Sequence, residues 1–316
     1  MEYPDYTPDR ELPPWLAQAF VPVDSALRQN RAAHAWLVSG AEGLGRPWLY
    51  RYWAWRLLCE TGAACGQCRA CRLLAQGSHP DVLWVMPEDR PTISVDQLRQ
   101  MARFVWETPQ MGRAKLVILD PAEAMTLAAA NALLKTLEEP PAYATLVLGT
   151  ASPGTVLPTI RSRCAQMVVP VPDAAVVREW LAGQGDQAPS ADVIEAGLAL
   201  GLAPFELLAD AEGRVRALKQ LESDWQAWLA GKVTLTELAT RWSGLDQGDT
   251  LEGLMRILYR QVAGGPVQDA LQAVVAMAYE RLAEIRRRFM EKRNLNPLLV
   301  WEHWLMQVRR DMKELK

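Results

Sequence analysis

The sequence predicts an α/β domain built on a parallel sheet, followed by a C-terminal region that is entirely helical. Two short apolar runs, at 116–119 and 145–150, flank a segment at 128–137 that is rich in Ala and Leu and contains no Gly or Pro. Strand, helix and strand in this order form a βαβ unit of a parallel sheet. From about residue 211 onward, apolar stripes at helical spacing alternate with turn-like breaks.

Size and composition bound the class of protein. The chain has 316 residues, 50% of them hydrophobic, which is enough for two or three domains. Its formal net charge of −3 argues against a protein that coats nucleic acid through bulk positive charge. No apolar run reaches the roughly 18–20 residues of a membrane span, and the acidic start, which contains a proline, is unlike a signal peptide. We therefore expect a cytoplasmic protein with reduced cysteines and no membrane partner.

Further elements are expected from the same patterns. Apolar stretches at 35–38, 81–86 and 166–169 predict additional strands. Ser94 is expected to cap an amphipathic helix that extends to residue 107. Pro140 and Pro141 should end the helix at 128–137, because proline lacks a backbone N–H and restricts the preceding residue. Shorter helices are expected at 23–30, 48–58, 155–160 and 173–181.

A glycine-rich loop at 39–47 follows the first expected strand. Gly40 and Gly45 have the separation found in the phosphate-binding loop G-x-x-x-x-G-K-[ST]. Arg46 stands where the lysine that reaches the terminal phosphates belongs, and Pro47 stands where the hydroxyl that holds magnesium belongs. Pro47 also lacks the N–H that would face an anion at the helix start. The loop is therefore expected not to support ATP hydrolysis, while nucleotide binding without turnover stays open.

A cysteine cluster follows the next expected helix. Four of the five cysteines lie within thirteen residues: Cys59, Cys65, Cys68 and Cys71. This spacing suits a tetrahedral structural zinc, because a short loop containing glycine lets two sulfurs reach one ion and two helix ends supply the others. Four protein sulfurs leave no open position for a catalytic water. The alternative is four unligated buried thiols. Cys164 stands apart and is expected to be a core thiol, not a nucleophile.

Two motifs identify a family. Residues 131–141 read NALLKTLEEPP, and Ser162-Arg163-Cys164 follows. Together they resemble the clamp-loader subunits of bacterial DNA polymerase III, a clade of the AAA+ superfamily. The resemblance is strongest over 35–170 and thins to a helical pattern after about residue 210. It implies an AAA+-type α/β core with the zinc module inserted at 1–169, a small helical lid at 170–210, and a helical collar for oligomerisation at 211–316.

The same resemblance shows where this chain departs from active ATPases. In active members, the strand that matches 116–119 ends in Asp-Glu. The aspartate binds magnesium, and the glutamate orients the attacking water. Here Asp120 is present, but Pro121 occupies the place of the glutamate. Active relatives also carry a nucleotide-sensing arginine in a region where this chain has Pro204. With Arg46 and Pro47, these departures imply no intrinsic ATPase activity and no functional ATP or magnesium in the chain's own site.

Arg163 has a different implied role. In the family, ATP lies at a subunit border, and the arginine of the Ser-Arg-Cys motif reaches its terminal phosphate from the neighbouring subunit. Arg163 is thus the candidate arginine finger acting in trans, with Ser162 as part of the motif. Arg161 lies two residues earlier and would point away on a helix. The alternative for Arg163 is an ordinary charged surface residue.

The lost phosphate loop, the retained arginine and the four cysteines resemble the delta-prime branch of the family, not gamma, tau or delta. This implies a rigid stator in a five-subunit assembly with gamma/tau and delta subunits, which loads the sliding clamp onto primed DNA for the polymerase holoenzyme. Two other functions stay open. One is an active clamp-loader ATPase. The other is a zinc-containing nucleic-acid-binding protein that binds through residues 59–71 and a basic cluster at 281–293. If the chain does not bind nucleic acid, this basic cluster is a solvated helix face or a contact with a partner subunit.

Overall fold

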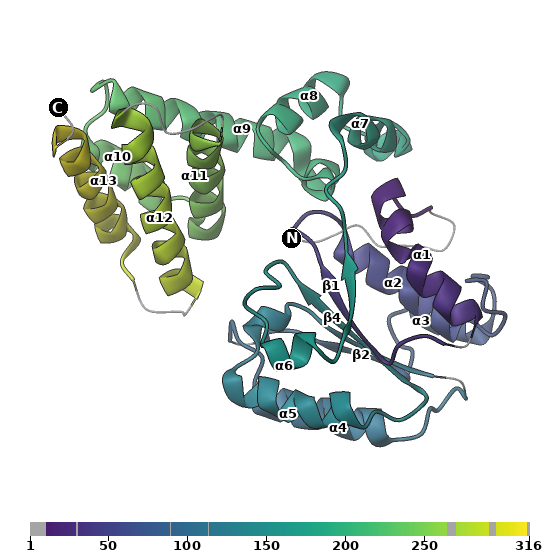
Figure 1. Ribbon diagram of the computed structural model, residues 1–316. Helices are drawn as coiled ribbons and strands as arrows, with labels where there is room; N and C mark the ends of the chain where they lie inside the picture. Colours follow the sequence, from purple (N-terminus) through teal and green to yellow (C-terminus); the bar gives the residue numbers. More distant parts are fainter. Residues whose placement is uncertain are drawn as a thin grey trace. The chain divides into compact units, whose positions relative to one another are not determined.

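Figure 1 shows the computed structural model of the chain, which describes residues 11–29, 31–88, 90–112, 114–263, 270–290 and 295–314. The chain divides into two compact units. The first extends to Ala188 and includes Ala203–Ala209, and the second comprises Pro189–Leu202 and the chain from Asp210. Each unit has its own hydrophobic core. The predicted division into domains at 1–169, 170–210 and 211–316 stays a prediction.

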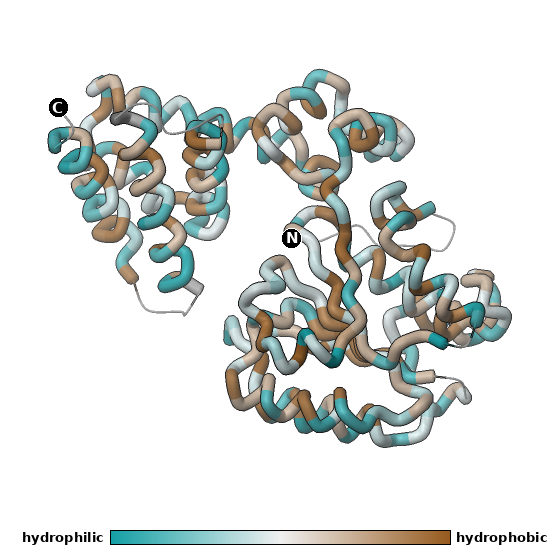
Figure 2. Tube along the Cα trace, viewed as in Figure 1, coloured by the Kyte–Doolittle hydropathy of each residue, from teal (hydrophilic) through white to brown (hydrophobic). Residues whose placement is uncertain are grey.

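The first unit is built on five parallel strands in the order β2-β3-β4-β1-β5. Every residue of β1, β3 and β4 is buried, whereas the edge strands β2 and β5 are partly exposed. Burial on both faces explains why the inner strands read as nearly continuous apolar runs, coloured brown in Figure 2. The strands are β1 (Ala35–Ser39), β2 (Val82–Val85), β3 (Lys115–Leu119), β4 (Ala144–Thr150) and β5 (Ala165–Val168).

Helices flank this sheet on both sides (Figure 1). The helices of the first unit up to residue 182 are α1 (Pro14–Arg28), α2 (Arg46–Leu58), α3 (Arg69–Ala75), α4 (Val95–Trp106), α5 (Leu127–Glu138), α6 (Pro158–Arg161) and α7 (Ala174–Ala182). α4 and α5 pack together on one side, and α1 and α2 pack together on the other. This arrangement confirms the predicted α/β core built on a parallel sheet.

Local signals explain where these helices begin and end. The hydroxyl of Ser94 accepts the backbone N–H of Gln97 at the start of α4, and the Gln97 side chain accepts the backbone N–H of Ser94. This reciprocal pair is a capping box. α5 ends at Glu138, before Pro140 and Pro141. The capped start and the proline stop therefore lie within one or two residues of the predicted bounds.

α1 is longer than the helix predicted at 23–30. It begins at Pro14 because an apolar stripe that includes Trp15, Phe20 and Val23 is buried along one face. Pro22 lies inside the helix, and an interior proline normally argues against helix. Packing of the stripe against the first unit outweighs that local penalty.

The second unit is entirely helical in its described residues, as predicted for the C-terminal region. Its helices are α8 (Ala191–Ala199), α9 (Pro204–Leu229, which begins in the first unit), α10 (Leu235–Ser243), α11 (Gln247–Val262), α12 (Ala270–Met290) and α13 (Pro297–Glu314). α9 is interrupted at Asp210, whose backbone is non-helical. The core contains the buried tryptophans Trp225, Trp242, Trp301 and Trp304. Residues 264–269 and 291–294 of this predicted helical region lie outside the described residues.

Candidate functional site

The glycine-rich loop connects β1 to α2 through a tight backbone turn. Gly43 and Gly45 have φ values of 77° and 92°, in the left-handed region that favours glycine. A Cβ at Gly45 would lie 2.1 Å from a ring carbon of Phe205, and one at Gly43 would lie 2.4 Å from the Cβ of Ala203. Both glycines are therefore required by the close approach of residues 203–205 as well as by the turn.

Phe205, in the first turn of α9, covers the loop. Its backbone N–H donates to the carbonyl oxygen of Gly43 at 3.0 Å, and its buried ring packs edge-on against Trp48, with ring centroids 4.9 Å apart. In a working phosphate site, the backbone N–H groups at the helix start face the anion. Here an apolar ring lies against Gly45, and Pro47 has no N–H to offer. The side chain of Phe205 therefore covers the loop at Gly45, where a phosphate would otherwise approach the backbone.

Arg46 turns toward the end of β3. Its Nε donates to Oδ2 of Asp120 at 3.3 Å, its Nη2 donates to Oδ1 of Asp120 at 3.1 Å, and its Nη1 donates to the carbonyl oxygen of Gly40. Arg46 is only 7% exposed. Burial by itself would lower the pKa of Arg46, but the carboxylate of Asp120 outweighs burial and raises it. The charges of Arg46 and Asp120 thus neutralise each other.

Tyr50 and Gly149 complete this closed site. A Cβ at Gly149 would lie 1.9 Å from the hydroxyl oxygen of Tyr50 and 2.5 Å from Cγ of Asp120, so only glycine leaves room for both. Burial, and then the negative charge of Asp120, raises the pKa of Tyr50, which keeps the phenol protonated. Pro121 follows Asp120 directly, and Pro204 precedes Phe205. Neither proline carries a group that could orient water or sense a phosphate.

Arg163 lies on the surface, two residues after the end of α6. Its Nη1 donates to the carbonyl oxygen of Thr159 at 3.0 Å, and its Nη2 donates to Oε1 of Glu138 at 2.7 Å. The side chain is 37% exposed. Arg161 is also exposed, and its guanidinium donates to the carbonyl oxygen of Pro153 at 3.2 Å. The guanidinium of Arg163 is therefore held by its own chain but open to an approaching partner.

The two neighbours of Arg163 in the motif differ in environment. Ser162 is exposed, and its hydroxyl donates to the carbonyl oxygen of Thr159 at 3.1 Å. Cys164 belongs to the hydrophobic core of the first unit. Burial raises the pKa of Cys164 to about 11, so the thiol is neutral at physiological pH. A buried neutral thiol is a core residue, in agreement with the expectation from sequence.

The four clustered cysteines converge from two helices and the loop between them. Cys59 is the C-cap residue of α2, Cys68 is the N-cap residue of α3, and Cys71 lies in the first turn of α3. All four sulfurs lie within 4.8 Å of one another. Sulfur separations are 3.6 Å for Cys59 and Cys65 and 3.9 Å for Cys65 and Cys71. A tetrahedron with bonds of about 2.3 Å has edges of about 3.8 Å, so the group could hold one metal ion.

Backbone donors support thiolates in this cluster. The N–H groups of Cys65, Cys68 and Cys71 donate to the sulfurs of Cys59, Cys65 and Cys68, each at 3.4 Å. Burial opposes ionisation of Cys59, but hydrogen bonds with Thr61 and Cys65 outweigh it and lower the pKa of Cys59 to about 5, whereas burial and the neighbouring Cys68 raise the pKa of Cys71. An anionic sulfur is the form that binds metal.

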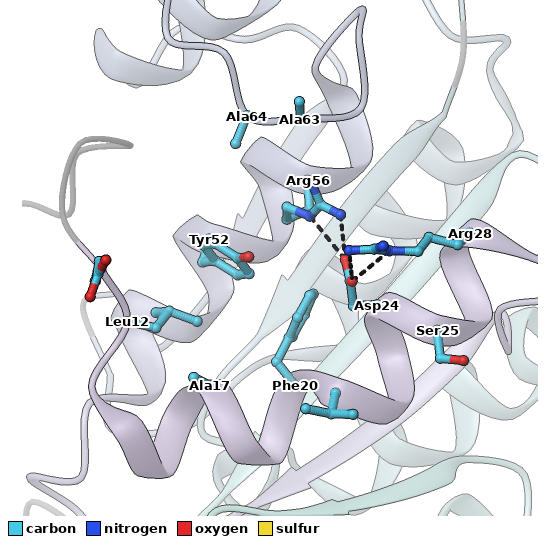
Figure 3. A pocket seen from close by; sticks show the side chains of 12 residues that line it. Leu12, Ala17, Phe20, Asp24, Ser25, Arg28, Tyr52, Arg56, Ala63 and Ala64 are labelled. Atoms are coloured by element: carbon cyan, nitrogen blue, oxygen red, sulfur yellow. Dashed lines mark hydrogen bonds and ion pairs between the residues drawn. The ribbon is translucent and has the colours of Figure 1, made fainter.

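An ion-pair network ties this cysteine loop to α1 (Figure 3). Asp24 on α1 accepts hydrogen bonds from Arg28 at 2.8 Å and from Nε of Arg56 on α2 at 3.1 Å. Arg56 also donates to the carbonyl oxygen of Gly62, within the cysteine loop, at 2.6 Å. These side chains border a cavity of about 730 Å³ between α1, α2 and the loop. Asp24 thus connects α1 to α2, and Arg56 extends the network to the cysteine loop.

The basic cluster predicted at 281–293 is partly neutralised within α12 and α13. Arg281 pairs with Asp311, and Arg288 pairs with Glu284, which also lies 3.8 Å from Arg287. The last two basic residues of the cluster lie outside the described residues. Three of the four described arginines of the cluster, Arg281, Arg287 and Arg288, therefore have an acidic partner.

Comparison with known proteins identifies the family. A family model described as "DNA polymerase III, delta subunit" matches residues 16–173. The DNA polymerase III subunit delta' of Pseudomonas aeruginosa is 39% identical over 248 residues, which cover 77% of this chain and 66% of that protein. The corresponding subunit of Escherichia coli is 36% identical over 218 residues, covering 68% and 62%. The chain belongs to the DNA polymerase III delta-prime family.

The delta-prime match does not extend over the whole of its relatives. The chain spans 66% and 62% of the length of these two proteins. The DNA polymerase III subunit tau/gamma of Haemophilus influenzae is 34% identical over 161 residues, which cover 50% of this chain and 23% of that protein. None of the described helices combines the length and apolar composition that a membrane span requires.

Three residues near the candidate sites of this delta-prime family member could not be identified from the sequence. Phe205 lies against Gly45, Glu138 accepts a hydrogen bond from Arg163, and the hydroxyl of Tyr50 lies beside Gly149. Phe205 follows Pro204, and Glu138 lies in the motif at 131–141, but no local pattern indicates which residue either one meets. Their roles depend on which elements pack together.

Proposed function

We propose that this chain is a clamp-loader subunit that has no ATPase activity of its own and lends Arg163 to the ATP site of a neighbouring gamma/tau subunit. In this proposal it acts in the bacterial cytoplasm as a stator within an assembly that also contains a delta subunit. The assembly loads the sliding clamp onto primed DNA for replication. Family membership supports the choice of partners.

One contrast carries the proposal. The guanidinium of Arg46 is buried and paired with Asp120, while the guanidinium of Arg163 is at the surface. A buried cation already bound to a carboxylate is not available to a phosphate, and the ring of Phe205 lies against the loop that would cradle one. Of these two guanidinium groups, only that of Arg163 is accessible to a phosphate on another subunit.

The chemistry asked of Arg163 is charge stabilisation. During phosphoryl transfer, negative charge spreads over the oxygens of the transferred group, and an arginine supplied in trans stabilises it. Where this has been measured in GTPases, the effect on rate is on the order of 10³–10⁵. Arginine suits this task because its planar guanidinium forms two parallel hydrogen bonds with a phosphate, which lysine does not.

The test is ATP turnover in the assembled complex. The chain is combined with delta and with a gamma/tau variant whose own Ser-Arg-Cys arginine is replaced, so that Arg163 is the remaining trans arginine. Arg163→Ala should then abolish most of the clamp- and DNA-dependent turnover, and Arg163→Lys should recover little of it. Arg161→Ala is the matched control, because it removes a nearby exposed arginine. Unchanged turnover with Arg163→Ala, or ATP hydrolysis by the isolated chain, contradicts the proposal.

For the cysteine cluster, we propose zinc in a structural role. Four sulfurs at tetrahedral separations are the ligand set that zinc prefers. The metal would join the end of α2 to the start of α3 and hold the loop that Arg56 contacts. Cys68→Ser should lower both the zinc content per chain, measured by atomic emission, and the thermal midpoint. One zinc per chain at full stability in that variant would exclude this ligand set.

A further inference from the structure

We propose that Glu138 is the positioning residue for Arg163: its carboxylate holds the guanidinium in the orientation in which it meets the neighbour's phosphate. This inference rests on the proposed role of Arg163 in trans and adds a residue to that role. Glu138 lies in the motif NALLKTLEEPP, and Arg163 lies in Ser-Arg-Cys. The two motifs are therefore connected by one direct contact.

The contact holds the guanidinium at two points. Nη2 of Arg163 donates to Oε1 of Glu138 at 2.7 Å, and Nη1 donates to the carbonyl oxygen of Thr159 at 3.0 Å. Glu138 is the last residue of α5, and Thr159 lies in α6. Support from two different helices fixes the plane of the guanidinium as well as its position. A single contact would leave the side chain free to rotate about that bond.

This arrangement leaves donors available for a ligand. A guanidinium has five N–H groups, and the two contacts use one each, so about three remain for phosphate oxygens. The Arg163 side chain is 37% exposed and that of Glu138 is 51% exposed, so a partner can approach the pair. The carboxylate thus orients the arginine without covering it.

The position of Glu138 is unfavourable for its own helix. Negative charge at the C-terminal end of a helix is disfavoured by the helix dipole. Helix stability therefore does not explain an acidic residue at the end of α5, whereas a contact with Arg163 does. The prolines at 140 and 141 end α5 at this point, and Pro158 begins α6. The backbone at Glu138 and at Thr159, the two residues that hold the guanidinium, is consequently restricted by these prolines.

Holding the arginine in advance should affect turnover more than folding. A long, free side chain loses rotamer entropy when it engages a phosphate, and a pre-oriented one loses less. The pair is exposed, so its removal should change the stability of the chain little. The expected signature is a lower kcat for ATP with an unchanged KM and an unchanged thermal midpoint.

The experiment is a double-mutant cycle in the complex described for Arg163. Glu138→Ala should lower kcat about fivefold, which corresponds to about 1 kcal/mol, the upper range for an exposed ion pair. Glu138→Gln keeps the acceptor oxygen and should stay within about twofold of the wild type. Glu139→Ala is the matched control, because it removes the adjacent exposed carboxylate, and it should leave kcat unchanged. In the Arg163→Ala background, Glu138→Ala should have no further effect.

The outcomes separate this inference from the proposed function. If Arg163→Ala lowers kcat and Glu138→Ala does not, the positioning role is overturned and the arginine finger stands. If Glu138→Ala lowers kcat equally with and without Arg163, the glutamate acts through something else and the inference is also overturned. If Arg163→Ala itself changes nothing, the proposed function fails, and this inference fails with it.

Discussion

Replacing Asp120 with alanine should destabilise the first unit, because it leaves Arg46 buried without its partner. Arg46 is 7% exposed, and Asp120 accepts two of its three hydrogen bonds. In Asp120→Ala, only the carbonyl oxygen of Gly40 still accepts from the guanidinium. A working ATPase would behave differently, since its aspartate holds magnesium and not an internal arginine.

The magnitude follows from the burial of the pair. Removing one partner of a buried ion pair costs about 3–5 kcal/mol. The side chain of Asp120 is 18% exposed, so water reaches part of the site, and we expect a loss of about 3 kcal/mol in the free energy of unfolding. Asp120→Asn keeps an acceptor but loses the charge and should fall between this variant and the wild type. Arg46→Met combined with Asp120→Ala removes both charges and should recover most of the loss.

Two measurements on the full chain check this prediction. Urea titration gives the free energy of unfolding for each variant. Amide hydrogen exchange of β1 and β3 assigns the change to the first unit, because those strands carry the loop and Asp120. A loss below about 0.5 kcal/mol in Asp120→Ala would contradict the buried pair. So would a double variant as unstable as the single one.

Two further predictions concern the closed loop and the ion-pair network. Magnesium-ATP at millimolar concentration should leave the thermal midpoint of the chain unchanged, because Phe205 covers the loop. For the same reason, the double variant Arg46→Lys with Pro47→Thr should release no phosphate from ATP. A rise in the midpoint, or measurable phosphate release, would contradict this. Burial raises the pKa of Asp24, but the arginines, Arg56 foremost, outweigh it, so the pKa is lowered overall. The stability from Asp24 is therefore present above the carboxyl's unfolded pKa of 3.8 and is lost as pH falls through the lower folded pKa. Asp24→Asn should cost about 0.5–1 kcal/mol at pH 7 in urea titrations, and this difference should vanish in strong acid; a constant difference at every pH would refute the ionic account.

Several features of this protein could be predicted because their signals are local. A serine cap at 94, a proline stop at 140 and apolar runs of four to seven residues determine hydrogen bonding and periodicity within one or two helical turns. The cysteine spacing likewise limits how far four sulfurs can separate. The family resemblance rested on two short motifs, and the comparisons confirm it.

Other features depend on long-range packing, which outweighs or hides the local signal. Pro22 locally disfavours helix, yet α1 extends through it because Trp15 and Phe20 are buried in the first unit. The sequence shows that Arg46 and Pro47 depart from the phosphate-loop pattern. It does not show that Arg46 pairs with Asp120, 74 residues away.

By itself, the sequence determined most of the elements, the family resemblance, and where the glycine-rich loop departs from the phosphate-loop pattern. Only the tertiary structure decided that Phe205 lies against Gly45, that Arg46 is neutralised inside the fold, and that Glu138 holds Arg163 at the surface. The reason is physical. Caps, breaks and periodicity depend on neighbours a few residues apart, whereas the partner of a charged side chain depends on strand order and on the packing of helices that the chain brings together from far apart.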